Sequence, residues 1–250
     1  MTLSLLTALL TPAMAQEPLP DAPSGHIEAL ALTRVPDVLG AGVVYESPLR
    51  LRGGLSAGFI PAGYAGLVND IARDLEAWDE TTGYVVSQLL PGSITVRADV
   101  GWRPLADKAW FVAGGYQRVL LRGEVSPYEV TEALGDFDGL EDLSKADKAE
   151  LKNNPDLYLP EILVGAGLHQ VTFESGYQWE SPERVLLRLS LGAAVTLNAK
   201  SDVNMDDIVY EDLTIDTDPY RSEASSQLDE TLQRYFHTPT LGIAVGYRFR

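Results

Sequence analysis

Apolar and polar side chains alternate with a period of two along several stretches of the chain, which is the pattern of β-strands with one apolar face. The longest stretch covers residues 184–199, where odd positions carry Val, Leu and Ala. Its even positions are mostly Arg, Ser, Gly, Thr and Asn, with Leu186 and Ala194 as apolar members. The alternation recurs over 49–59 and 94–103. These stretches predict amphipathic strands.

The less apolar face of these strands distinguishes a small barrel from a soluble sandwich. In a sandwich this face is solvated and rich in Thr, Lys and Glu, whereas here Arg and acidic residues alternate with Gly and Ser. A barrel of about eight strands has an interior only wide enough for side chains, so small residues make room for charged ones that must pair. We expect an interior charge network of Glu46, Arg50, Arg52, Arg97, Asp99, Arg184, Arg188 and Arg248.

The connections between the predicted strands alternate between short and long. We expect strands over residues 26–34, 38–47, 49–60, 92–103, 108–122, 160–174, 183–199 and 238–250. The long connections cover 61–91, 123–159 and 200–237. Tight turns on one side and long external loops on the other are typical of outer-membrane barrels. The predicted fold class is all-β, an antiparallel up-and-down transmembrane β-barrel of about eight strands, in which residues 26–250 form a single domain.

Charge is distributed unevenly between these regions. The chain has 36 acidic and 19 basic side chains and a net charge of −17. The three long connections hold 25 of the acids and 7 of the bases, whereas the rest of the chain holds 11 acids and 12 bases. A near-neutral body suits a membrane span, and the acidic balance excludes nucleic acid as a partner.

The last predicted strand, from Thr240 to Phe249, has the sequence TLGIAVGYRF. It resembles the C-terminal strand of bacterial outer-membrane β-barrels, in which apolar residues alternate and an aromatic residue ends the strand. The resemblance implies that Tyr247 and Phe249 form the signal that the barrel-assembly machinery recognises. It also implies a bacterial outer-membrane location, in contact with membrane lipid and lipopolysaccharide. Here Arg250 follows the aromatic residue, and Ala244 stands where glycine is common.

The first residues predict export from the cytoplasm. A short apolar stretch is followed by Ala13-Met14-Ala15, the small-x-small pattern of a signal-peptidase site. We therefore interpret residues 1–15 as a cleaved signal peptide and residues 16–25 as a disordered leader. No Lys or Arg precedes the apolar stretch, so two alternatives stay open: a start farther upstream, or an ordinary buried helix.

Three histidines are the candidates for catalysis. A lipid-modifying barrel enzyme would need His169 or His237 beside a serine and a carboxylate. If Ile162, Val164, Ala166 and Leu168 point outward, the alternation over 160–174 predicts that His169 faces the barrel interior in a structural role. His26 and His237 lie near the ends of predicted strands, so we expect them to be solvated. No established catalytic motif or phosphate-binding loop occurs in the chain, so we expect neither an enzyme nor a cofactor.

The long loops carry two further patterns. Acidic residues cluster over 136–142 and 202–207 without the register of an EF-hand, which favours solvated loops over weak divalent-cation sites. Apolar residues also recur at helical spacing, which predicts short amphipathic helices. We favour helices that cap the barrel mouth, because an apolar helix face needs something nearby to cover; the alternatives are helices at the membrane interface and a surface for a partner. They are Leu67, Val68, Ile71, Leu75 and Trp78 in one loop and Leu228, Leu232, Tyr235 and Phe236 in another.

Function is less constrained than fold. We expect an outer-membrane barrel with a structural or surface-interaction role, whose acidic, helical external loops cap a packed polar interior. The alternatives are a narrow porin-like passage for small solutes, a membrane-embedded lipid-modifying enzyme, and a soluble ligand-binding barrel with a polar outer face.

Overall fold

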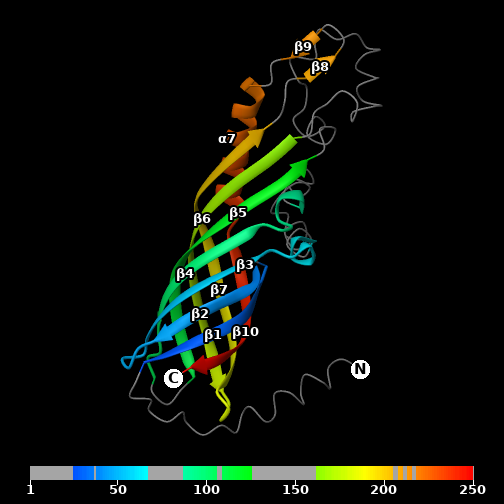
Figure 1. The fold of residues 1–250 in the computed structure, drawn as a ribbon. Coiled ribbons are helices and arrows are strands. Elements are labelled where there is room, and N and C mark those ends of the chain that lie inside the picture. The colour runs from blue at the N-terminus through cyan, green and yellow to red at the C-terminus, as the bar shows by residue number, and fades with distance from the viewer. Residues whose placement is uncertain are drawn as a thin grey trace, which may run out of the picture.

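Eight strands form a closed antiparallel β-barrel, which confirms the predicted fold (Figure 1). The computed structural model describes residues 25–36, 38–66, 87–105, 109–125, 162–204, 208–210, 213–215 and 218–249. The strands are β1 (His26–Val35), β2 (Val38–Glu46), β3 (Leu51–Phe59), β4 (Ile94–Trp102), β5 (Trp110–Val125), β6 (Ile162–Glu180), β7 (Val185–Asn204) and β10 (Thr238–Phe249). Neighbours in sequence pair with each other, and β10 pairs with β1 to close the barrel.

A long segment between β7 and β10 contains the remaining elements. Strands β8 (Ile208–Tyr210) and β9 (Leu213–Ile215) form a separate two-stranded sheet, and helix α7 (Asp218–Tyr235) follows them. Among the described residues, no helix combines the length and apolarity needed to cross a bilayer. The helix predicted around Leu228 and Leu232 is confirmed as part of α7, whereas the one predicted from Leu67 to Trp78 lies outside the described residues.

The outer face of the barrel is apolar around its whole circumference. Many large apolar side chains on this face are at least 38% exposed: Ile27, Leu39, Val43, Tyr45, Leu51, Leu55, Phe59, Ile94, Val96, Val100, Trp102, Tyr116, Phe173, Tyr177, Val185, Leu191, Val195, Leu197, Leu241, Ile243, Val245, Tyr247 and Phe249. We call this surface the apolar belt. Alternate positions on the same strands point inward and carry the polar and charged groups, as the sequence pattern predicted.

Strands β5, β6 and β7 are much longer than the others and extend past the barrel as a three-stranded projection (Figure 1). They have 16, 19 and 20 residues, compared with 9 to 12 in the other barrel strands. The prediction placed the ends of β6 and β7 at 174 and 199, which was too short. Residues 175–180 were missed because Gln178 and Glu180 are polar residues that face inward rather than loop residues.

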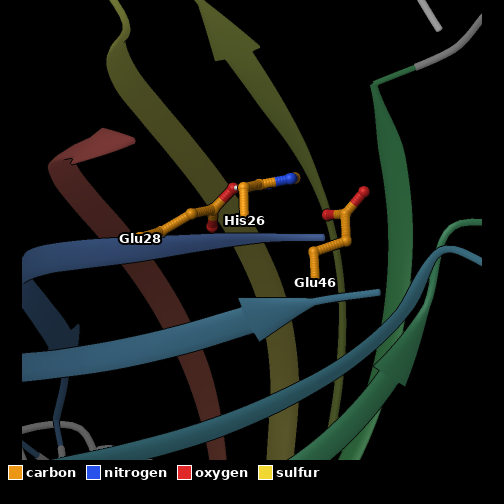
Figure 2. Close-up of side chains that lie close together, drawn as sticks. All are labelled: His26, Glu28 and Glu46. Carbon is orange, nitrogen blue, oxygen red and sulfur yellow. Dashed lines mark hydrogen bonds and ion pairs between the residues drawn. The ribbon is translucent and has the colours of Figure 1, made fainter. Parts of the chain in front are cut away.

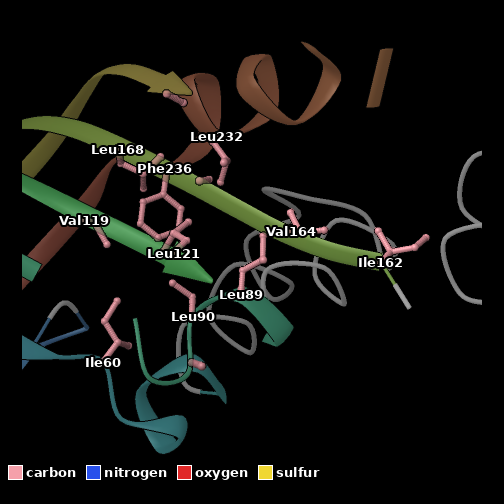
Figure 3. Close-up of a cluster of buried hydrophobic side chains, with 13 residues drawn as sticks. Ile60, Leu89, Leu90, Val119, Leu121, Ile162, Val164, Leu168, Leu232 and Phe236 are labelled. Carbon is pink, nitrogen blue, oxygen red and sulfur yellow. The ribbon is translucent and has the colours of Figure 1, made fainter. Parts of the chain in front are cut away.

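A hydrophobic cluster fills the inner side of this projection (Figure 3). It joins the inward faces of β5 and β6 to α7 and to two short segments after β3 and before β4. Its members are Ile60, Ala65, Leu89, Leu90, Val119, Leu121, Ile162, Val164, Ala166, Leu168, Ala199, Leu232 and Phe236. The apolar face of α7 therefore packs against the inner side of the projection.

The same cluster reverses the prediction for His169. The sequence analysis assigned Ile162, Val164 and Leu168 to the lipid side and His169 to the interior. In the structure these apolar residues are buried in the cluster, and His169 points outward. Above the belt the inner side is the apolar side, because a helix rather than a charged lumen lies against it.

Helix α7 also covers a free edge of the sheet. Strand β10 pairs with β7 only as far as Ala194, and a bulge at the His169/Gln170 register shift follows. Four side chains, three on α7 and one just after it, are spaced four residues apart and hydrogen-bond to the main chain of β7 beyond Ala194. Ser225 Oγ accepts from Val203 N at 3.3 Å, Asp229 accepts from Ser201 N, Gln233 Nε2 donates to Leu197 O at 3.1 Å, and His237 Nδ1 accepts from Thr196 N at 3.1 Å. We call this row the edge ladder.

Two of the tight turns have the same sequence pattern and geometry. Residues 46–50 read ESPLR and residues 180–184 read ESPER. In each turn the serine Oγ accepts from the amide four residues later, and the arginine has a positive φ, 64° at Arg50 and 69° at Arg184. A non-glycine residue in this region is disfavoured, so the turn depends on the serine bonds and the flanking strand pairs.

Some predictions lie outside the described residues. These are the signal peptide over 1–15, nearly all of the leader over 16–25, and the acidic cluster over 136–142. Only part of the second acidic cluster, 202–204, is described.

The turn geometry predicts different effects for two substitutions of Arg184. We expect Arg184→Gly to leave stability unchanged or slightly higher, because glycine adopts a positive φ freely. Arg184→Val should lower the free energy of unfolding by about 1–2 kcal/mol relative to the glycine variant. The measurement is the urea midpoint of the refolded barrel in detergent micelles. Equal midpoints for the two variants would contradict the assignment.

The edge ladder predicts a local effect of Asp229→Ala. Loss of the acceptor should speed hydrogen exchange of the Ser201 amide by about tenfold, the equivalent of one hydrogen bond of roughly 1 kcal/mol. Glu230→Ala is the matched control, because Glu230 is the exposed neighbour on the same helix. If the Ser201 amide exchanges equally fast in both variants, the helix does not protect this edge.

Candidate functional site

The barrel interior is organised around the carboxylate of Glu28 on β1, which is fully buried. Its Oε2 lies 3.0 Å from Nη2 of Arg52 and 3.0 Å from Nη2 of Arg188. Its Oε1 accepts from Gln178 Nε2 at 2.7 Å and lies 3.2 Å from His26 Nε2. These contacts come from β1, β3, β6 and β7, so one carboxylate connects strands from opposite sides of the barrel.

The neighbours of Glu28 are tied to one another. Gln178 Oε1 accepts from Arg52 and from Arg188, in each case at 2.8 Å. The guanidinium groups of both arginines lie over the ring of Phe111, at 5.0 and 5.1 Å from its centroid. A ring face attracts a desolvated cation, so Phe111 supports the arginines from the side away from Glu28.

Three further ion pairs lie toward the end of the barrel that carries the tight turns. Glu46 lies 3.3 Å from Arg103 Nη1 and 3.5 Å from Arg52 Nε. Glu180 lies 2.6 Å from Arg248 Nη1. Glu46, Arg52 and Arg103 are buried in the apolar shell of the strands, where only paired charges are stable.

A second charged layer lies on the opposite side of Glu28, toward the projection. Glu174 Oε2 accepts from Arg97 Nη2 at 2.8 Å and from Arg34 Nη2 at 3.4 Å. Asp99 lies 3.6 Å from Arg97 Nε. A Cβ at Gly54 would come within 2.8 Å of the Asp99 carboxylate, so glycine on β3 provides the space for this side chain.

Hydrogen-bonded amides separate this layer from the hydrophobic cluster. Gln117 Nε2 donates to Gln170 Oε1 at 2.6 Å, and Gln170 Nε2 donates to Thr196 Oγ1 at 3.0 Å and to the carbonyl of Phe236 at 3.3 Å. The described interior is therefore filled in sequence by ion pairs, amides and an apolar cap.

The predicted network is divided by the structure into two groups. Arg50 and Arg184 stand in the tight turns before β3 and β7 rather than on an inward strand face. The remaining predicted residues line the interior and form ion pairs: Glu46, Arg52, Arg97, Asp99, Arg188 and Arg248. The alternation of the sequence identified these six residues, because every second residue of a strand points to the same face.

Several side chains of the interior network were not predicted from the sequence. They are His26, Glu28, Arg34, Arg103, Phe111, Glu174, Gln178 and Glu180. The signal for Glu28 was available, since it shares parity with Leu30 and Arg34 on a strand whose outward residues are only Ile, Ala, Thr and Val. His26 was predicted to be solvated, but it is buried because its ring packs against the Glu28 carboxylate.

His26, Glu28 and Glu46 form a group with the ligand types of a metal site (Figure 2). One ligand atom from each lies within 4.8 Å of the others. Arg52 contacts both carboxylates, and Arg103 contacts Glu46 as well. These guanidinium groups already supply the compensating positive charge, and they would repel a divalent cation. The donor set therefore fits an ion-pair network better than a metal centre.

A small cavity of about 30 Å³ lies between the two charged layers. Its lining includes Leu30, Ser56, Asp99, Phe111 and Glu174. Space of this size holds about two water molecules and no larger solute.

Most aromatic residues of the outer face lie at the end with the tight turns. Tyr45, Trp102, Trp110, Tyr177, Trp179, Tyr247 and Phe249 all lie near the ends of their strands there. Tyr247 and Phe249 pack edge to face, with ring centroids 5.1 Å apart. Tyr116 lies at the other border of the apolar belt, where its hydroxyl contacts His169 Nδ1. His237 is exposed and accepts from the Thr196 amide.

Comparisons with known proteins add structural similarity at low sequence identity. No family model and no curated protein matches the chain. Among solved structures, the chain is similar to Acinetobacter baumannii CarO2, with 11% identity and a TM-score of 0.38 over 90% of this chain and 98% of that one. Acinetobacter baumannii CarO matches with 11% identity and a TM-score of 0.36 over 90% and 97% of the two chains.

The contacts of Glu28 predict a large effect of Glu28→Gln on stability. The substitution keeps the shape but leaves the buried arginines short of one negative charge, so the free energy of unfolding should fall by about 3 kcal/mol. The urea midpoint in micelles measures it. Glu183→Gln, at an exposed turn position, is the matched control and should change stability by less than about 0.5 kcal/mol. A similar small change at Glu28 would show that the network is not energetically coupled.

Proposed function

We propose that this chain is a bacterial outer-membrane β-barrel with a closed lumen and a structural or surface-interaction role. The observation that carries the proposal is the reversal of polarity across the barrel wall. The belt presents large apolar side chains outward on every strand, while the ion pairs face inward. In water such a belt would drive aggregation, whereas lipid tails cover it without cost. A soluble ligand-binding barrel requires the opposite arrangement.

The strand lengths support the same proposal. A tilted strand crosses the hydrocarbon core with about 9–11 residues. Strands β1 to β4 have 9 or 10 residues, which is one crossing. The extra length of β5, β6 and β7 then stands outside the membrane, on the side of the long connections. Aromatic residues at the tight-turn end fit an interfacial girdle.

The filled interior supports a role that does not depend on transport. Ion pairs, hydrogen-bonded amides and the hydrophobic cluster lie one above the other, so a solute would have to displace all three. A narrow passage for small solutes is the second candidate, favoured by the cavity between the charged layers. A non-enzymatic role fits the contacts of His169 and His237, which are Tyr116 and a main-chain amide in the described residues.

The proposed partners follow from this location. They are membrane lipid, lipopolysaccharide, and the barrel-assembly machinery, which would recognise Tyr247 and Phe249 at the end of β10. Residues 1–15 would direct export and be removed. A weak divalent cation at the acidic loops stays a proposal, as does the exclusion of nucleic acid.

Cell fractionation combined with conductance tests both parts of the proposal. We expect the protein in the outer-membrane fraction, with a faster gel band before boiling than after it. In a planar bilayer, the same heat-modifiable sample should give no discrete channel openings. Recovery in the soluble periplasm would remove the membrane assignment, and reproducible unitary currents would favour the solute passage over a closed barrel.

A further inference from the structure

The ionisable groups on the outer wall of the barrel are confined to one place. Along the described strands, outward positions carry apolar, glycine, hydroxyl and aromatic side chains almost throughout. The exceptions among the side chains described are Arg118 and Arg122 on β5, His169 on β6, and Lys200 and Asp202 on β7. All five lie on the projection, in adjacent rows of the same three strands.

The strand register places these residues in neighbouring rows around two glycines of β6. Arg118 pairs across to His169, which pairs to Asn198, while the next rows place Gly167 beside Lys200 and Gly165 beside Arg122. The two glycines leave the central strand without side chains. A Cβ at Gly167 would lie 3.9 Å from Arg118 Nη2, so the guanidinium group lies over this floor. We call the set the basic groove.

The basic groove begins where the apolar belt ends. The row of Tyr116, Val171 and Val195 lies at the border of the belt, and the first groove row lies two residues away on β5 and on β6. The hydroxyl of Tyr116 contacts His169 across this border. In a bilayer, the level just beyond the apolar belt is the level of lipid headgroups.

We propose that the basic groove binds a phosphate group of an anionic lipid in the outer leaflet, with Arg118, Arg122 and Lys200 as its ligands. This inference rests on the proposed membrane location. Arg presents a planar fork that matches phosphate oxygens in pairs, and Lys adds a mobile point charge. A positive strip on a chain of net charge −17 marks the headgroup level as the place where the protein attracts anions rather than repelling them.

Asp202 gives the proposal a second, opposite-signed test. It is exposed, and its row joins Gly165 and Arg122. A carboxylate at this position weakens phosphate binding by repulsion. Removing it should therefore strengthen binding, whereas removing the bases should weaken it.

The experiment measures binding of bisphosphorylated lipid A to the full chain in dodecyl maltoside micelles at low salt. The triple variant R118Q/R122Q/K200Q should bind about tenfold or more weakly, and D202N should bind more tightly than the parent. Arg234→Gln, an exposed charge on α7 outside the groove, should leave affinity unchanged. Lipid A without phosphates should bind the parent and the triple variant equally.

Three results would overturn the proposal. They are equal affinity of the parent and the triple variant, equal loss in R234Q, and complete competition by millimolar inorganic phosphate, which would assign the groove to a soluble anion. Heat-modifiable migration of each variant shows that the barrel is folded. A parent protein found in the periplasm would defeat the membrane location itself, whereas an outer-membrane protein with unchanged lipid binding would defeat only the groove.

Discussion

Every charge inside a narrow barrel must find its partner within the barrel, and this constraint organises the rest of the molecule. Water is scarce there and the wall is one residue thick, so an unpaired guanidinium or carboxylate would be strongly destabilising. Glu28 meets the constraint by serving Arg52 and Arg188 at the same time, with Gln178 and Phe111 holding the arginines in place. Glycines such as Gly54 are part of the same solution, because they leave room for the charged side chains of neighbouring strands.

Strand length and outer-wall chemistry change together along β5, β6 and β7. Up to Val195 the outer wall is apolar and the inner wall is charged. Beyond the bulge that follows Thr196, the outer wall carries Lys200 and Asp202, and the inner wall packs against α7. Across this bulge the outer wall thus changes from apolar to charged and the inner wall from charged to apolar, while the sheet continues.

Alternation was enough to predict the barrel, the turn positions and the faces of Arg52, Arg97 and Arg188, because every second residue of a strand points to the same face and one face of these strands is apolar. It failed where the surroundings change. The apolar positions of β6 from Ile162 to Leu168 look the same whether lipid or a helix covers them, so His169 was assigned to the wrong face. Polar inward residues such as Gln178 and Glu180 resemble a loop, which shortened the predicted β6.

The edge ladder binds main-chain atoms, so the need to cover the edge of β7 does not restrict the side chains that β7 carries on its outer face. The groups of α7 bind the amides and a carbonyl of β7 and make no demand on the β7 side chains that face away. The covered edge therefore places no constraint on the identity of Lys200 and Asp202. The charge of this wall can be set by what the wall binds rather than by what the fold requires.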